Sequence, residues 1–296
     1  MKILITGATG FIGSNLIKFL RKKNENVVGL SKHGSHDKKI YSISLYQKLA
    51  LEKFLKKQKF DVVIHLAAQL NEKNPNIIFK ENCYNTKNLL DCCIKNGVKR
   101  FVFASTHLVY AKSQYLPIDE YHKVCPLTNY AVSKLISENI CKMYSTLYDL
   151  ETIILRISSV YGIGQSDKYI MPTMIKNYLE KKLVVHKYRN GYQLIDLIHV
   201  SDVCKALELS CKSKKLGTFN IASGKPLTSV DIAKKILKLD GNIKIITKKI
   251  PIETNHFFYN IEKARKELKF SSSIKISKKI IQDCFNDLID RKIIQQ

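Results

Sequence analysis

A short glycine-rich turn near the amino terminus constrains the fold of this chain more than any other feature. The apolar segment "KILIT" (2–6) has the character of a buried strand, and the "GATGFIGSNL" that follows it begins an amphipathic stretch at 11–23. Gly7, Gly10 and Gly13 thus fall between a strand and a helix, where glycine permits a tight turn and a close approach of the backbone to a pyrophosphate. The pattern predicts a dinucleotide-binding unit.

Apolar runs and amphipathic stretches continue to alternate through the first half of the chain. Further strands are predicted at 26–30, 61–67, 100–105 and 151–157, and helices at 45–58, 75–96 and 128–148. Repeated strand–helix order is typical of an α/β fold with a doubly wound parallel sheet, the Rossmann fold.

The alternation loosens after Gly162. Helices are predicted near 170–181, 228–238 and 274–292, and a strand near 183–187. We expect a dinucleotide-binding domain over 1–160, to which 194–222 returns, and a smaller, intertwined substrate-binding lobe made of 161–193 and 223–296. The substrate should lie in the cleft between the two.

The composition of the chain argues against a membrane protein, a metalloprotein and a nucleic-acid-binding protein. None of the apolar runs is long enough to cross a bilayer and the first residues lack the features of a secretory signal, so we expect a cytoplasmic protein without a membrane partner. The eight cysteines show no CxxC spacing, which favours buried apolar thiols and no metal. The net charge of +25 comes from scattered lysines rather than a basic stripe, which indicates a solvated surface and no nucleic-acid partner.

The segment "YAVSK" carries the first candidate for chemistry. Tyr130 and Lys134 are four residues apart, so on a helix they share one face about a turn from each other. An ammonium group near a phenol favours the phenolate and lowers the phenol's pKa toward neutral pH. A tyrosine tuned in this way can exchange a proton with an alcohol.

Taken in order, the motifs resemble the extended short-chain dehydrogenase/reductase superfamily, in its nucleotide-sugar epimerase/dehydratase branch. The similar segments run nearly from end to end: "TGATGFIGS", "DVVIHLAA", "ENCYNTKNLLDCC", "FVFASTHLVY", "YAVSK", "LRISSVYGIGQ", "DLIHVSDV", "FNIASGK" and "NIEKARKELKF". The resemblance implies an NAD(P)-dependent oxidoreductase acting on C4 of a nucleotide-linked sugar. It also implies a homodimer formed through the helices near 75–96 and 128–148.

The same resemblance assigns roles to individual residues. Tyr130 would be the catalytic acid/base, Lys134 would bind the nicotinamide ribose, and Thr106 would hydrogen-bond the reacting sugar oxygen. Asn82 matches a family asparagine near the edge of the sheet, and an architectural role is equally open. The cofactor would contact Gly7, Thr9, Gly10, Phe11, Ile12, Gly13, Ser31, Lys32, Leu66, Ala67 and Ala68, as well as Tyr130 and Lys134.

The end of the second predicted strand departs from the NAD-binding pattern. An acid that accepts the ribose hydroxyls is expected there, but the chain has Ser31, Lys32 and His33. A hydroxyl and a cation suit a 2′-phosphate, so the sequence favours NADP, and Ser42 in place of a second family acid agrees with an altered pocket. NAD stays open, with Asp37 as a carboxylate that could reach back.

The substrate half departs as well. His107 and Leu108 follow Thr106 where dehydratases carry acids, which argues against 4,6-dehydration and leaves His107 either a proton-transfer group or a packed neighbour.

Two family groups that contact the substrate phosphates are also replaced, an asparagine by Ser159 and an arginine by Ile195. With that arginine lost, either another cation substitutes, for which Arg189 and Lys187 are candidates, or the substrate is unusual. The predicted substrate contacts are therefore Thr106, His107, Ser159 and Arg189.

Three functions remain open from the sequence. The favoured hypothesis is an NADPH-consuming 4-keto-sugar reductase. The alternative is a nucleotide-sugar 4-epimerase with tightly bound NAD, which uses the same residues. A more remote alternative is a non-catalytic dinucleotide-sensing or RNA-associated protein on the same fold.

Overall fold

A parallel sheet forms the centre of the molecule. Within residues 1–110, 112–239 and 243–293, which a computed structural model describes, seven strands lie in the order β10-β6-β5-β4-β1-β2-β3 with every neighbouring pair parallel. These strands are β1 (Lys2–Thr6), β2 (Asn26–Ser31), β3 (Ile40–Ser42), β4 (Val62–His65), β5 (Arg100–Thr106), β6 (Glu151–Ile157) and β10 (Gly217–Ile221). The order reverses between β1 and β4, so the predicted Rossmann fold is confirmed.

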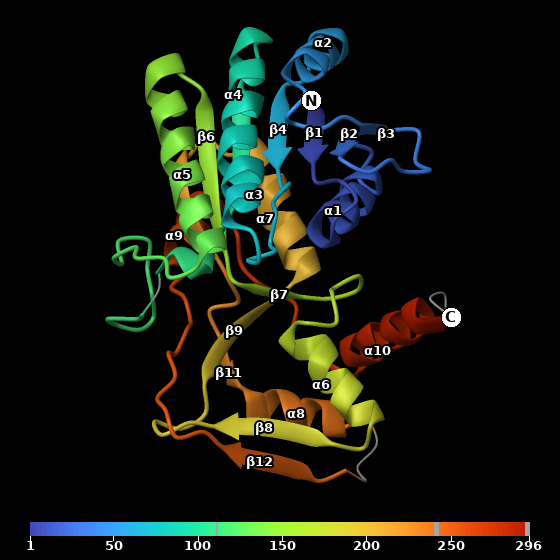
Figure 1. Cartoon of the computed structure of the whole chain (residues 1–296), viewed down its shortest axis with the longest axis vertical. Helices are drawn as coiled ribbons and strands as arrows, with labels where there is room; N and C mark the ends of the chain where they lie inside the picture. The colour runs from blue at the N-terminus through green and yellow to red at the C-terminus, as the bar shows by residue number, and fades with distance from the viewer. Residues whose placement is uncertain (111, 240–242, 294–296) are drawn as a thin grey trace.

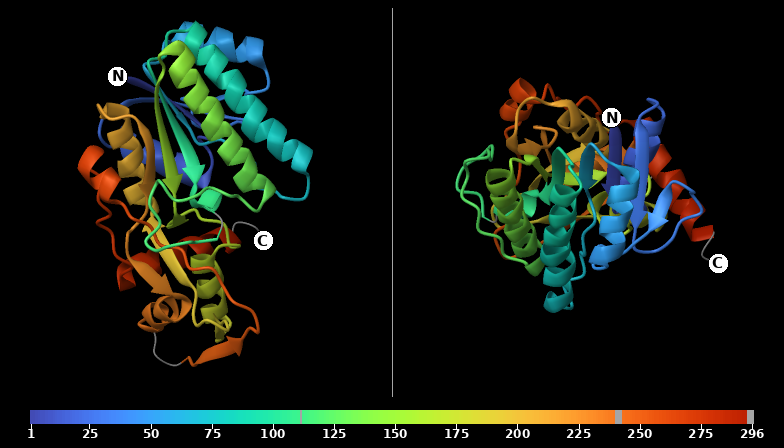
Figure 2. Two further views of the ribbon diagram at one scale, coloured as in Figure 1. Left: turned by 90° about the vertical axis from the view of Figure 1, so that its left-hand side faces the viewer. Right: turned by 90° about the horizontal axis from the view of Figure 1, so that it is seen from above.

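Helices cover both faces of this sheet (Figures 1 and 2). On one face lie α1 (Phe11–Arg21) and α7 (Val200–Lys212), and on the other lie α2 (Lys48–Gln58), α4 (Asn85–Lys95) and α5 (Asn129–Tyr148). Because side chains alternate along a strand, Ile3 and Ile5 pack with the first group while Leu4 packs with the second. The short α3 (Pro75–Phe79) and the π-helical turn η1 (Lys80–Tyr84) lead directly into α4.

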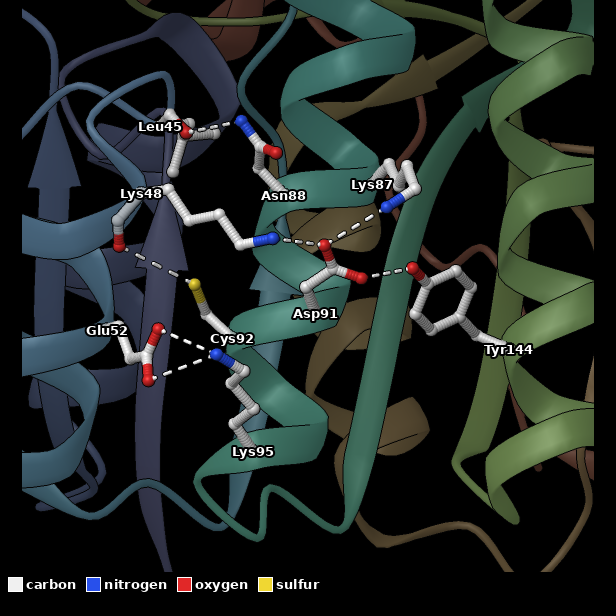
Figure 3. Close-up of polar contacts among 9 residues, drawn as sticks. All are labelled: Leu45, Lys48, Glu52, Lys87, Asn88, Asp91, Cys92, Lys95 and Tyr144. Carbon is white, nitrogen blue, oxygen red and sulfur yellow. Dashed lines mark hydrogen bonds and ion pairs between the residues drawn. The ribbon is translucent and has the colours of Figure 1, made fainter.

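A carboxylate on α4 ties the three helices of the second face together (Figure 3). Asp91 accepts hydrogen bonds from Lys48 Nζ of α2 at 2.6 Å, from Lys87 Nζ at 3.1 Å, and from the Tyr144 hydroxyl of α5. Partial burial opposes ionisation of Asp91, but these three donors outweigh it and hold its pKa at about 2. This network fixes α5, the helix that carries Tyr130 and Lys134, against its neighbours.

The second half of the chain builds smaller elements beside the carboxyl ends of the central strands. Here β7 (Ser159–Tyr161), β9 (Leu194–His199) and β11 (Pro226–Thr228) form one small sheet, and β8 (Leu183–Lys187) and β12 (Ile245–Lys249) another. The helices of this lobe are α6 (Ile170–Leu179), α8 (Ser229–Leu237) and α10 (Lys278–Ile293). Of the other two, η2 (His107–Tyr110) follows β5 directly, and α9 (Glu262–Glu267) packs beside β10 of the central sheet. A separate apolar core that includes Ile175, Leu183 and Ile236 holds this lobe together.

Segment 194–222 connects the two parts. Its first strand, β9, pairs with β7 and β11 of the small sheet, whereas α7 packs on the central sheet and β10 joins its edge beside β6. We propose that the small lobe, with its own core, is the substrate-binding part. No helix among the described residues is long and apolar enough to cross a membrane.

Candidate active site

The glycine turn between β1 and α1 brings three segments of backbone into contact. Gly7 has φ +68°, and a Cβ there would lie 2.7 Å from the backbone nitrogen of Ala67. A Cβ on Gly13 would lie 2.1 Å from the carbonyl oxygen of Gly7. The first turn of α1 begins at Gly10 without a side-chain cap, so its free N–H groups can meet a phosphate.

A cavity of about 290 Å³ opens over this turn. Eight of the predicted cofactor residues line it: Gly7, Thr9, Gly10, Ser31, Lys32, Leu66, Ala67 and Ala68. Phe11, Ile12 and Gly13 lie in the first turn of α1, where Phe11 and Ile12 pack against the apolar core. Tyr130 and Lys134 do not line this cavity and lie on α5.

Asp37, the carboxylate that could have reached back to hold NAD, does not line the cavity and pairs with another side chain. Both carboxylate oxygens of Asp37 accept hydrogen bonds from the Arg21 guanidinium, one of them at 3.2 Å, and this pairing lowers the pKa of Asp37. Ser31 Oγ lies 2.8 Å from Thr9 Oγ1 and donates to the carbonyl of His33 at 2.7 Å. Both candidate groups on this loop are therefore engaged with the protein itself.

An acid reaches the cavity from another element. Glu81 of η1 lines the cavity and accepts hydrogen bonds from Lys32 Nζ at 2.9 Å and from Asn85 Nδ2 at 3.0 Å. Asn85 also lines the cavity, and its buried Oδ1 has no hydrogen-bond partner among the described residues. An unpartnered acceptor suits a ribose hydroxyl or an adenine amino group, so these residues fit the adenosine half of a dinucleotide.

Sequence reasoning missed this acid and several of its neighbours. The cavity is also lined by Thr6, Leu30, Ile43, Ser44, Leu45, Gln69, Glu81 and Asn85. Glu81 and Asn85 are four residues apart in the segment "ENCYNTKN", so on a helix they share one face. This spacing was the feature of the sequence that could have identified the two residues as a pair.

Tyr130 and Lys134 lie on the first turns of α5, on the face directed at β5. Lys134 is 2% exposed, its Nζ lies 4.0 Å from the centre of the Phe103 ring, and burial lowers its pKa to about 8. Burial raises the pKa of the half-buried Tyr130, and no hydrogen bond joins the two side chains in the described structure. The expected lowering of the Tyr130 pKa is not found, because burial of the phenol raises this pKa and the neighbouring Tyr169 raises it further.

Hydrogen bonds fix the entrance to α5. The Thr128 side chain caps the helix by accepting from the Ala131 backbone, and Glu72 accepts from the Tyr130 backbone at 3.0 Å. Asn82 donates to the Gln69 carbonyl and to Ser133 Oγ of α5. These contacts fit the architectural role, which was one of the two roles open for Asn82.

The predicted substrate residues fall into two groups. Thr106 ends β5, is 7% exposed and accepts a hydrogen bond from the Leu108 backbone. Next to it, His107 has Nδ1 2.7 Å from the Tyr259 hydroxyl and Nε2 3.5 Å from Ser159 Oγ. Burial lowers the pKa of His107 to about 4, so the ring is neutral at pH 7. Arg189 is exposed on the turn after β8 and contacts none of them.

A buried ion pair supports α5 and was not predicted. Glu138, fully buried on α5, accepts from Arg156 Nη2 of β6 at 2.8 Å and from Ser105 Oγ of β5 at 2.5 Å. Glu138 stands four residues beyond Lys134, and Ser105 directly precedes Thr106. The pair therefore links the two elements that carry the predicted catalytic residues.

A Rossmann sheet, a glycine-lined dinucleotide cavity and a tyrosine–lysine pair at the ends of the strands together define an NAD-dependent enzyme of the short-chain dehydrogenase/reductase type. Residues 3–222 match the model of the "NAD dependent epimerase/dehydratase family". The chain belongs to this family. The predicted family and the enzyme class are thus confirmed, and the non-catalytic alternative is not supported.

Several individual proteins are similar to this chain over most of its length. The chain is 34% identical over 250 residues to a putative UDP-glucose 4-epimerase of Methanocaldococcus jannaschii, covering 80% of this chain and 81% of that protein. It is 29% identical to a UDP-glucuronate 4-epimerase of Thermodesulfobacterium geofontis, covering 92% of each. A solved UDP-glucuronic acid 4-epimerase of Bacillus cereus in complex with NAD superposes with a TM-score of 0.86 at 26% identity, covering 98% of this chain and 99% of that one.

We predict that Gly13→Ala weakens NAD binding at least about tenfold and lowers the melting temperature, because the added methyl collides with backbone that cannot move independently. Isothermal titration calorimetry and thermal unfolding measure the two effects. Gly34→Ala is the matched control, since a Cβ at Gly34 meets no atom within 4 Å. Equal NAD affinity in the two variants would contradict the assignment of the turn.

Proposed function

We propose that this chain is a 4-epimerase that inverts C4 of a UDP-linked sugar and retains NAD between turnovers. The observation that carries the proposal is the environment of Thr106, where the neighbouring side chain is a neutral His107 bonded to Tyr259 and not a carboxylic acid. Epimerisation at C4 needs no acid there, whereas loss of water does. Relatives named as 4-epimerases support this function over the reductase that the sequence favoured.

Tyr130 and Thr106 have separate roles in the proposed reaction at C4. Bound NAD would supply the hydride acceptor, and inversion at C4 requires the keto-sugar to rotate so that the hydride returns to its opposite face. Tyr130 takes the proton of the C4 hydroxyl when that carbon is oxidised and gives it back when the ketone is reduced. Thr106 holds the C4 oxygen in place.

Lys134 makes the phenolate form of Tyr130 accessible. With a pKa of about 8, Lys134 is mostly protonated at pH 7, so it carries positive charge about one helical turn from the half-buried Tyr130. The nicotinamide of the oxidised cofactor carries a second positive charge. We infer that binding of NAD lowers the pKa of Tyr130, which burial raises in the chain alone.

We predict that the purified chain interconverts a UDP-hexose and its C4 epimer without added reductant, and that Tyr130→Phe lowers kcat at least about 1,000-fold while NAD affinity changes less than about threefold. Epimer ratios followed by chromatography and NAD titration measure the two quantities. The control is Tyr121→Phe, because Tyr121 is 89% exposed. A requirement for stoichiometric NADPH would contradict the epimerase and restore the reductase.

We propose NAD, not the NADP that the sequence favoured, as the cofactor. Lys32, the cation expected to welcome a 2′-phosphate, already pairs with Glu81, and that carboxylate lines the same cavity. A 2′-phosphate entering there would meet negative charge, while ribose hydroxyls could donate to it. Glu81 thus replaces the acid missing from the end of β2. The complexes of related enzymes with NAD agree.

We predict that the wild-type chain binds NADH at least about tenfold more tightly than NADPH, and that Glu81→Gln reduces this ratio about tenfold because Lys32 becomes free for the 2′-phosphate. Calorimetric Kd values for both dinucleotides test it. Asp37→Asn is the matched carboxylate control and should leave the ratio unchanged, since Asp37 pairs with Arg21. Tighter NADPH binding by the wild-type chain would reverse the proposal.

The proposed homodimer is based on exposed apolar side chains of α5. Ile136, Met143 and Leu147 are 40%, 46% and 64% exposed and share one side of this helix. We propose that this side pairs with a second copy, as the resemblance implied for the helices near 75–96 and 128–148. The cytoplasmic location, and the lack of membrane and nucleic-acid partners, stay predictions.

Analytical ultracentrifugation tests the dimer. We expect twice the 34.0 kDa mass of the chain, and the monomer mass after Met143→Lys with Leu147→Lys, because two charges would be buried without partners. A monomeric wild-type chain would refute this interface.

A further inference from the structure

The small lobe contains a second cavity that none of the steps above uses. It has a volume of about 200 Å³ and is lined by residues of β7, β9, β11 and α8 and of the segment 272–276 that leads to α10. It shares no lining residue with the dinucleotide cavity, and it contains none of Thr106, Tyr130 and Lys134. It is therefore a separate site in the described structure.

Three lysines from three different segments line this cavity. Lys225 follows β10, Lys235 belongs to α8, and Lys275 lies in the segment before α10. None of the three ammonium groups has a salt bridge or a side-chain hydrogen bond among the described residues. Three lysines that line one cavity favour binding of an anion there.

The floor of the cavity is apolar apart from one hydroxyl. Leu197, Leu227 and Ile276 contribute aliphatic surface. Tyr161 also lines it, is only 1% exposed, and its hydroxyl has no hydrogen-bond partner among the described residues. Burial raises the pKa of Tyr161, so the hydroxyl keeps its proton. A buried hydroxyl without a partner costs about 1–3 kcal/mol, which a ligand atom placed against it would offset.

The other polar side chains of the cavity are already committed to the protein. Ser223 donates to Asp196 at 2.5 Å, and Ser272 and Ser273 donate to Asp202 at 2.9 and 3.1 Å. These hydroxyls keep two buried carboxylates satisfied and are not free to donate to a ligand. The groups left to recognise one are the three ammonium groups and the Tyr161 hydroxyl.

We propose that this cavity binds a small organic phosphate, with the phosphate among Lys225, Lys235 and Lys275 and the apolar part over Leu197 and Leu227, where one polar atom meets the Tyr161 hydroxyl. The volume is below the roughly 300–1,000 Å³ typical of drug-sized ligands, so the organic part is small. Tyr161 belongs to the same strand, β7, as Ser159. An occupant would thus contact the strand that carries a predicted substrate residue, although its binding does not depend on the proposed epimerase activity.

The test uses the full chain saturated with NAD and UDP, so that the nucleotide sites are filled, and titrates phenyl phosphate by calorimetry. We expect saturable, salt-sensitive binding that is at least about tenfold weaker in the variant Lys225→Gln, Lys235→Gln, Lys275→Gln. Tyr161→Phe should weaken it about threefold, and phenol or inorganic phosphate alone should bind more weakly than phenyl phosphate.

The matched control carries Lys238→Gln, Lys248→Gln and Lys249→Gln, which remove the same charge from exposed lysines of the same lobe that do not line the cavity. Equal losses in the two triple variants would overturn the proposal, because they would mark a general effect of net charge. A crystal soaked with phenyl phosphate that shows only water against Tyr161 would also overturn it. Phosphate density among the three lysines would support it, whether or not the chain proves to be an epimerase.

Discussion

The buried ion pair between Glu138 and Arg156 is the interaction on which the geometry of the active site depends. Two ionised groups removed from water are stable only when their remaining hydrogen-bonding capacity is satisfied. Here Arg156 and Ser105 together occupy the Glu138 carboxylate, so its place relative to β5 and β6 is fixed. Tyr130, Lys134 and Glu138 follow one another at intervals of four residues, so fixing the last sets the rotation of the whole helix face.

Burial shifts the pKa values of the two predicted catalytic side chains on this helix in opposite directions. It raises the pKa of Tyr130 and lowers that of Lys134, so in both cases it disfavours the charged form that catalysis uses. A further positive charge near Tyr130 would favour its phenolate. In the mechanism proposed above, oxidised NAD would bring that charge, so proton transfer by Tyr130 would depend on the bound cofactor.

The fold and the glycine turn could be predicted from the sequence because both depend on neighbours in the chain. Strand and helix periods placed β1, β2, β4, β5 and β6 and the helices between them, and the spacing of Gly7, Gly10 and Gly13 located the cavity. The adenosine pocket could not be predicted in the same way. Glu81 lies 49 residues from Lys32 in the sequence, and only the fold of the chain brings their side chains together. The absence of an acid at the end of β2 was a correct observation, but it could not reveal that Glu81, an acid from another element, lines the same cavity.

His107 is a neutral side chain next to Thr106, at a position where dehydratases of the family carry an acid. An ionised acid beside Thr106 would need water or a donor to stabilise its charge, whereas a neutral imidazole can be enclosed between the Tyr259 hydroxyl and Ser159. Tyr259 is itself buried and its backbone bonds to Asp196 of β9, so the ring of His107 is held by the segment that follows β12. The side chain beside Thr106 therefore has a fixed place and no charge at neutral pH. In the proposed mechanism, such a group would shape the space around C4 but could not serve as the acid that expulsion of water requires, and Tyr130 would exchange the proton.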